Sequence, residues 1–132
     1  MDDARVVMEG QIPPMGSFRD LVVWREAVAL AGATYRLTHG LPSAERYGLS
    51  SQLRRAAVSV SANIAEGCGR GGDRELVRFL QIARGSAHEV ESLLAVTVEL
   101  GMLDGRSIGA VQVQADRVSR QLTRLIRRLT PA

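Results

Sequence analysis

The sequence of 132 residues lacks lysine altogether, so arginine supplies all 17 of its basic residues. Because the phosphate-binding P-loop requires a lysine, this absence excludes that nucleotide site and any mechanism that uses a lysine amine. Aromatic residues make up only 4% of the chain, so the core must be built from leucine, valine, isoleucine and alanine. Few aromatic rings are therefore available to stack on nucleic-acid bases.

Cysteine, histidine and long apolar runs are equally scarce. Cys68 is the only cysteine, which excludes an intramolecular disulfide, and we expect it to be a small buried residue. His39 and His88 have no second histidine or cysteine at ligand spacing, so no metal site is predicted. No apolar run approaches the roughly 20 residues of a membrane helix. Asp2 and Asp3 stand where a secretory signal would be basic, and we therefore expect a cytoplasmic protein.

The chain has the length of one domain, and its first residues differ in character from the rest. Residues 1–16 contain two glycines and two prolines without sustained periodicity, so they are interpreted as a tail of low intrinsic order. Residues 17–132 form the predicted bundle domain. No segment alternates apolar and polar residues between turn signals, so no sheet is expected.

Apolar residues at spacings of three and four predict the first and last helices. The first helix, capped by Ser17, runs to about Gly40. Its apolar stripe is Leu21, Trp24, Val28, Ala31 and Tyr35. In the last helix the spacing is uninterrupted over Ile108, Val111, Ala115, Val118, Leu122, Leu125 and Leu129.

Two more helices are predicted between them. The second opens at Pro42, is interrupted at Gly48 and ends at Gly67, and the third is capped by Asp73 and runs for about 28 residues. Short connections imply antiparallel neighbours, so the predicted fold is all-α, an antiparallel up-and-down four-helix bundle.

The segment between the second and third helices contains a glycine pattern. Gly67, Gly69 and Gly72 spell G-x-G-x-x-G, but the pattern follows a helix, whereas a dinucleotide site needs a preceding strand. We interpret it as a helix breaker. Cys68 lies within it, and no serine or histidine signature of nucleophilic or metal catalysis accompanies it. The sequence therefore predicts no enzymatic activity and no cofactor.

A polar stripe runs along the second helix beside its apolar one. Its members are Gln52, Arg55, Ser59, Asn63, Glu66 and Arg70. A stripe of this kind is normally a solvated face, but here short hydrogen-bonding groups alternate with charges beside several alanines. We expect some of these groups to lie in a helix or subunit interface.

Several blocks of the sequence together carry a resemblance to a known family. They are FRDLVVW at 18–24, YGLSSQLRRAAVS at 47–59, NIAEG at 63–67 with Gly69 and Arg70, and ARGS at 83–86 with Glu89. The chain resembles the four-helix bundle proteins encoded in 23S rRNA intervening sequences. It also resembles their relative, the accessory variability determinant of diversity-generating retroelements. The blocks occur in family order from residue 18 to about 103, whereas the last helix matches only in pattern.

The resemblance implies a ring-shaped homo-oligomer, most often a homopentamer, with basic surfaces. For the retroelement relatives it implies binding of nucleic acid and of a reverse transcriptase, whereas the role of the ribosomal-RNA branch is unsettled. The two branches, the preference for RNA or DNA and the protein partner stay open at this point. The chain departs from its relatives in its longer N-terminal tail and its lack of lysine.

Carried over to this chain, the motif implies a structural polar network. Its members are Arg55, Asn63, Glu66, Arg70 and Glu89. Glu89 shares a stripe of the third helix with Ile82, Ser86 and Leu93, which would hold its carboxylate against a neighbouring helix. A buried carboxylate needs a cation, and Arg55 is the expected partner.

The basic residues are concentrated toward the end of the chain. The last helix presents five arginines on its outward face: Arg117, Arg120, Arg124, Arg127 and Arg128. Asp116 is the only acid after Gly105, although the whole chain has a formal charge of only +3. A second, weaker group lies at the start of the third helix: Arg70, Arg74, Arg78 and Arg84.

These two groups predict a nucleic-acid-binding accessory protein that binds the RNA or DNA backbone. The alternative is a protein-only oligomeric scaffold with a solvated arginine face.

Overall fold

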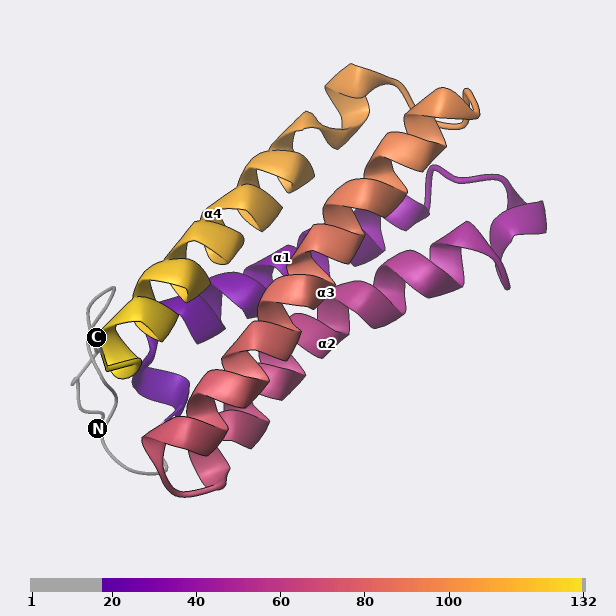
Figure 1. Ribbon diagram of the computed structural model, residues 1–132. Coiled ribbons are helices and arrows are strands. Elements are labelled where there is room, and N and C mark those ends of the chain that lie inside the picture. The colour runs from indigo at the N-terminus through magenta and orange to yellow at the C-terminus, as the bar shows by residue number, and fades with distance from the viewer. Residues whose placement is uncertain (1–17, 132) are drawn as a thin grey trace.

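The structure is a computed structural model, and it describes residues 18–131 (Figure 1). The predicted tail at 1–16 and the predicted cap at Ser17 lie outside these residues. The elements, in chain order, are η1 (Phe18–Asp20), α1 (Val22–Thr38), η2 (Ser43–Glu45), α2 (Leu49–Gly69), α3 (Asp73–Glu99) and α4 (Gly105–Leu129). No strand occurs between residues 18 and 131. None of the helices described there combines the length and apolarity needed to cross a membrane.

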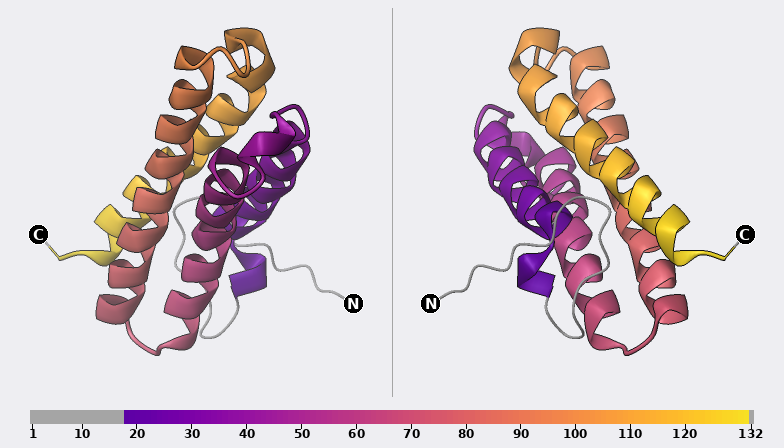
Figure 2. Two further views of the ribbon diagram at one scale, coloured as in Figure 1. Left: turned by 90° about the vertical axis from the view of Figure 1, so that its right-hand side faces the viewer. Right: turned by 90° about the vertical axis from the view of Figure 1, so that its left-hand side faces the viewer.

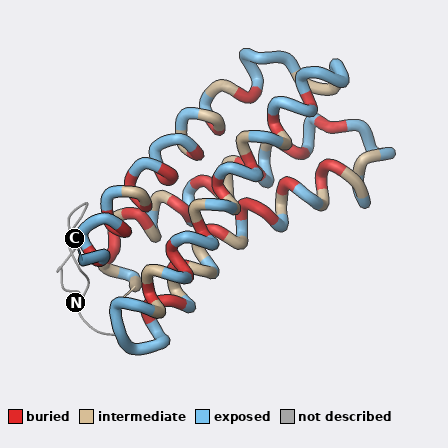
Figure 3. Tube along the Cα trace, viewed as in Figure 1, coloured by how far each residue is buried: buried red, intermediate tan, exposed pale blue. Residues whose placement is uncertain are grey.

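The four α-helices pack side by side in an antiparallel bundle (Figures 1 and 2). Each helix contacts its two neighbours, since α1 packs on α2, α2 on α3, α3 on α4, and α4 on α1, whereas the diagonal pairs do not approach one another. The buried residues therefore lie along the inner side of every helix (Figure 3). The predicted antiparallel four-helix bundle is confirmed, and the ring-shaped assembly stays a prediction.

The core side of α4 is the one that the sequence predicts. All seven residues of its uninterrupted apolar stripe, from Ile108 to Leu129, are buried. The helix begins at Gly105 with a cap that the sequence analysis missed, in which the Asp104 carboxylate accepts a hydrogen bond from the Ser107 backbone N–H at 2.7 Å. This hydrogen bond lowers the pKa of Asp104 below its ordinary value.

The core side of α1 differs from its predicted stripe. Buried positions on this helix are Val23, Ala27, Leu30, Thr34 and Thr38. Of the stripe predicted instead, Val28 is 43% and Tyr35 is 42% exposed. Two threonines can face the core because the Thr34 hydroxyl donates to the Leu30 carbonyl at 2.8 Å and that of Thr38 to the Tyr35 carbonyl at 2.7 Å. Leu21 of that stripe is buried, and Trp24 and Ala31 pack partly buried against the core, so the predicted stripe is correct only in part.

The connection between α2 and α3 corrects two further predictions. α2 continues to Gly69, so Gly67 is buried inside the helix, where an added Cβ would lie 2.8 Å from the Cβ of Phe79. The helix is broken instead at Gly71 and Gly72, whose φ angles of 76° and 126° disfavour any other residue. Asp73 is the first residue of α3, and the cap position belongs to Gly72.

Candidate nucleic-acid interface

All five predicted arginines of α4 are exposed, but they differ in their partners. Arg117 lies 3.7 Å from the Glu26 carboxylate on α1, and Arg120 donates to Asp116 one turn earlier at 2.8 Å. Both ion pairs are exposed to solvent, so they reduce the local positive charge without holding the side chains firmly. Arg127 and Arg128, in the last turn of the helix, form no ion pair with any residue between 18 and 131.

The arginines at the start of α3 are organised around one aromatic ring. Arg70 donates to Glu66 at 2.9 Å, and Arg78 donates to Glu75 at 3.3 Å. Their guanidinium carbons lie 5.2 Å and 4.5 Å from the centroid of the Phe79 ring. These contacts hold both guanidinium groups close to the protein surface. Arg74 is exposed and has no ion pair with the described residues.

The arginines at the start of α3 and those in the last turns of α4, which the sequence analysis treated as separate candidates, lie at the same end of the bundle. Because neighbouring helices are antiparallel, the last turn of α4 lies beside the first turn of α3 (Figure 2). A pocket of about 430 Å³ lies between them. It is lined by Asp73, Arg74 and Val77 of α3 and by Leu129, Thr130 and Pro131 at the end of α4. We call this region the basic end, defined by Arg70, Arg74, Arg78, Arg124, Arg127 and Arg128.

The predicted polar network is only partly formed within one chain. Asn63 Nδ2 donates to the carbonyl and hydroxyl oxygens of Ser59 at 2.8 and 2.9 Å, and the Ser59 hydroxyl lies 2.9 Å from that of Ser86 on α3. These short side chains join α2 to α3 at the seam between the helices. Glu66 does not take part in these contacts, and it forms an ion pair with Arg70 at the exposed end of α2.

Arg55 and Glu89 are exposed, and no hydrogen bond or ion pair with the rest of residues 18–131 is found for either. The prediction that Glu89 is buried in the bundle with Arg55 as its partner is therefore wrong for the single chain. The two side chains line the same shallow pocket of about 290 Å³, with Ser59 at its base. Because the serines occupy the seam, the longer charged side chains one turn away extend toward solvent.

Cys68 and His88 are two residues that the sequence analysis considered for catalysis or metal binding. Cys68 is buried in the last turn of α2, and burial raises the pKa of its thiol to about 11, so the thiol is protonated and unreactive at neutral pH. The Nε2 atom of His88 on α3 lies 3.2 Å from the Ser119 hydroxyl on α4, and its Nδ1 atom lies 4.0 Å from a carboxylate oxygen of Glu91. Between residues 18 and 131, no group of histidine, cysteine and carboxylate side chains could hold a metal ion.

The sequence profile of the 23S rRNA-intervening sequence proteins matches residues 19–124. The chain belongs to this family. A crystal structure of a protein of unknown function from the S23 ribosomal protein family of Bacteroides thetaiotaomicron has the same fold, with a TM-score of 0.71 and 19% sequence identity. The similarity covers 80% of this chain and 98% of that one. No curated protein matches the chain.

Membership of the intervening-sequence family accounts for the fold, and the family's function is unknown.

The structure also brings together residues that the sequence analysis did not select. Arg46 and Arg54 meet at the end of the bundle opposite the basic end, in a polar pocket between α1 and α2. A faint signal for this pocket is present in the sequence, since hydroxyl residues and arginines flank the Pro42–Gly48 connection.

Proposed function

We propose that the protein is a non-enzymatic, homo-oligomeric accessory protein that binds nucleic acid through its basic end. The observation that supports this function is the presence of Arg74 on α3 and of Arg127 and Arg128 on α4 at the same end of the bundle, all three exposed and without carboxylate partners among the described residues. Guanidinium groups bind phosphate oxygens through two parallel hydrogen bonds. Since aromatic residues are few, contact with the phosphate backbone and little sequence preference are expected.

A second feature supports the homo-oligomer. The outer sides of α2 and α3 expose two apolar side chains, Val58 and Ile82, on the stripes that flank the Ser59–Ser86 contact. Arg55 and Glu89 lie on the same stripes with opposite charges and no ion-pair partner among residues 18–131. A partly apolar surface with complementary charges suits a second copy of the chain. We propose that this α2–α3 face forms the contact between subunits in a pentameric ring.

Fluorescence anisotropy with a mixed-sequence RNA and the matching DNA duplex tests the binding. Each phosphate contact contributes a slope of log affinity against log salt of about −0.7 on single strands and about −0.9 on duplex DNA. Arg127→Gln with Arg128→Gln removes two unpaired charges, so the slope on single strands should become shallower by about 1.4. The matched control is Arg36→Gln with Arg106→Gln, which removes two exposed arginines at the opposite end of the bundle.

If both double variants lose the same affinity, net charge alone drives the interaction and the basic end is not the site. If neither loses affinity, the arginine face is simply solvated, and the protein-only scaffold becomes the better interpretation. That alternative is favoured by the ion pairs of Arg117 and Arg120, which already neutralise part of the face.

Light scattering after size-exclusion chromatography tests the assembly. The chain has a mass of 14.3 kDa, and the expected mass is a multiple of it, a pentamer in the proposed ring. Val58→Glu or Ile82→Glu should shift the mass toward the monomer, whereas Val113→Glu, on the more exposed outer side of α4, should leave it unchanged. A parent protein of monomer mass at micromolar concentration would contradict the proposal.

A reverse transcriptase is the further partner that the retroelement relatives would imply. The genomic neighbourhood decides this part of the proposal. A reverse-transcriptase gene beside this one adds that partner, whereas its absence restricts the proposal to nucleic acid.

A further inference from the structure

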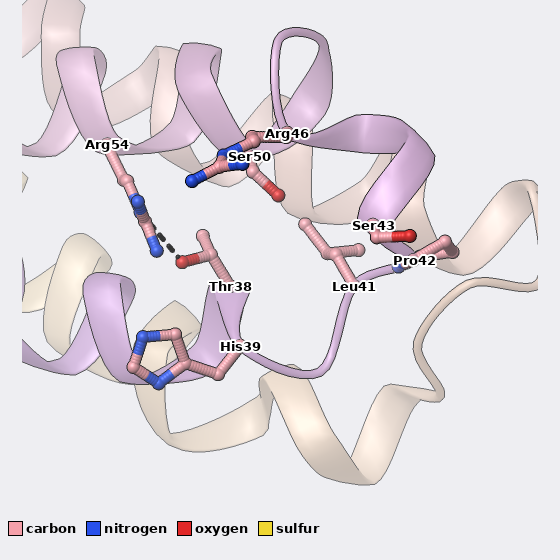
Figure 4. Close-up of a pocket in the computed structure, with 8 residues that line it drawn as sticks. All are labelled: Thr38, His39, Leu41, Pro42, Ser43, Arg46, Ser50 and Arg54. Atoms are coloured by element: carbon pink, nitrogen blue, oxygen red, sulfur yellow. Dashed lines mark hydrogen bonds between the residues drawn. The ribbon is translucent and has the colours of Figure 1, made fainter.

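A polar pocket of about 340 Å³ lies between the end of α1 and the start of α2, at the opposite end of the bundle from the basic end (Figure 4). Its lining is Thr38, His39, Leu41, Pro42, Ser43, Arg46, Ser50 and Arg54. Two arginines, an imidazole and three hydroxyl groups thus surround one cavity, and no carboxylate lines it. The composition favours an anionic ligand that accepts several hydrogen bonds.

Arg54 is held in position by its own neighbours. Its Nε atom donates to the Thr38 hydroxyl at 3.0 Å, and that hydroxyl donates to the Tyr35 carbonyl at 2.7 Å. The guanidinium carbon also lies 4.8 Å from the centroid of the Tyr35 ring. The two terminal nitrogens of Arg54 form no hydrogen bond with residues 18–131, so they stay available to a ligand. A guanidinium fixed through Nε loses little conformational freedom on binding.

Ser50 adds a hydroxyl group to the lining of the pocket. The residue is only 7% exposed, but its hydroxyl oxygen is not among the fully buried side-chain atoms that lack a partner between residues 18 and 131. Figure 4 shows this hydroxyl directed into the space bounded by Arg46 and Leu41. Because this oxygen borders an open cavity, the hydroxyl can donate a hydrogen bond to a molecule bound there. At the start of α2 the Glu45 carboxylate already accepts a hydrogen bond from the Leu49 backbone N–H at 3.1 Å, so the side chains of the pocket, and not the helix N-terminus, would hold a ligand.

We propose that this pocket binds a phosphate monoester, with Arg54 and Arg46 contacting its oxygens and Ser50 donating a hydrogen bond. The doubly charged group matches the two arginines better than the singly charged phosphodiester of an internal nucleotide. Such a group occurs at the 5′ end of a nucleic-acid strand and in free inorganic phosphate. Tyr47, beside the pocket, is 89% exposed, and the Arg46 guanidinium carbon lies 5.9 Å from its ring centroid, so a terminal base could stack there. This site rests on residues separate from the basic end.

Anisotropy with one oligonucleotide, labelled at its 3′ end and carrying either a 5′-phosphate or a 5′-hydroxyl, tests the proposal. The parent should bind the phosphorylated strand about tenfold more tightly, the gain expected from charge-assisted hydrogen bonds. Ser50→Ala should reduce this preference several-fold, and Ser50→Asp should abolish it. Arg106→Gln is the matched control, because it removes one exposed arginine near the same end of the bundle but outside the pocket, and it should keep the preference.

Inorganic phosphate, titrated as a competitor and followed by ³¹P NMR, separates the two sources of the ligand. Phosphate binding that depends on Ser50, without a preference for the phosphorylated strand, supports the pocket and identifies a small free phosphate as its ligand. No preference in the parent, together with no phosphate binding, would overturn the proposal. Binding of the 5′-hydroxyl strand reports on the basic end alone, so the two proposals can fail separately. Circular dichroism melting of each serine variant shows whether its fold is intact.

Discussion

α1 and α4 lie side by side in the bundle and bury one side each, but their outer sides have little in common (Figure 3). The outer side of α4 carries five arginines, and Val113 is its exposed valine. That of α1 exposes Val28 and the ring of Tyr35, while its buried side includes two threonines. α4 therefore divides cleanly between core and solvent. On α1 the two sides differ much less in polarity, so neighbouring helices decide which side is buried.

Truncating the leucines that face the core should have the largest effect, and it should be similar on both helices. Leu122→Ala on α4 and Leu30→Ala on α1 each remove a fully buried side chain, and each should lower the free energy of unfolding by about 3 kcal/mol. Val113→Ala and Val28→Ala, on the outer sides, should change it by less than about 0.5 kcal/mol. Urea denaturation measures all four values. If Val28→Ala lowered the free energy of unfolding as much as Leu30→Ala does, α1 would be rotated from the orientation described.

The two buried threonines of α1 should respond differently to replacement by valine. Thr38→Val removes the acceptor of the Arg54 hydrogen bond and should lower the free energy of unfolding by about 1 kcal/mol. Thr34→Val should be nearly neutral, because the Thr34 hydroxyl bonds only the Leu30 carbonyl within its own helix. Thermal melting of the two variants gives the comparison. If the two variants lost the same free energy of unfolding, the hydrogen bond between Arg54 and Thr38 would add nothing to stability.

The smallest effect is expected where α2 and α3 carry exposed charges. Arg55→Ala or Glu89→Ala should change the stability of the single chain by less than about 0.5 kcal/mol, because neither side chain has a partner in it. If the α2–α3 face joins subunits, either variant should instead lower the melting temperature in a way that depends on protein concentration. Melts at two concentrations separate these cases. A loss of several kcal/mol at both concentrations would restore the interpretation of a buried pair.

Sequence periodicity could define α4 because polar and charged residues occupy most of the positions between its apolar ones, so only one side could face the core. In α1 the stripe that begins at Leu21 and the one that begins at Val23 are almost equally apolar. The deciding residues, Thr34 and Thr38, look polar in the sequence but satisfy their hydroxyls within the helix. Hydropathy alone therefore could not identify the correct side.

For the candidate sites too, features that depend on one helix could be predicted from the sequence, whereas features that depend on how helices pack could not. The exposure of the α4 arginines could be predicted, since it depends on the periodicity of one helix. Whether Glu89 is buried depends on how α2 and α3 pair, and the Ser59–Ser86 contact at their seam excludes it from the interior. The polar pocket at the opposite end had only a faint signal in the sequence, because Thr38 on α1 comes beside Ser50 and Arg54, one turn apart on α2, only when the two helices pack together.

The close approach of α2 and α3 at Gly67 limits which residues the chain can tolerate there. Even an alanine methyl group would lie 2.8 Å from Phe79 Cβ and 3.1 Å from Leu76 Cδ1, so either the two helix backbones or the side chains of α3 would have to move. A complete substitution scan should find position 67 among the least permissive in the bundle, although the residue contributes no side chain. Gly69, two residues later, has open space around its Cβ and should accept alanine readily. The same scan would thus separate the glycine that permits packing from one that only ends a helix.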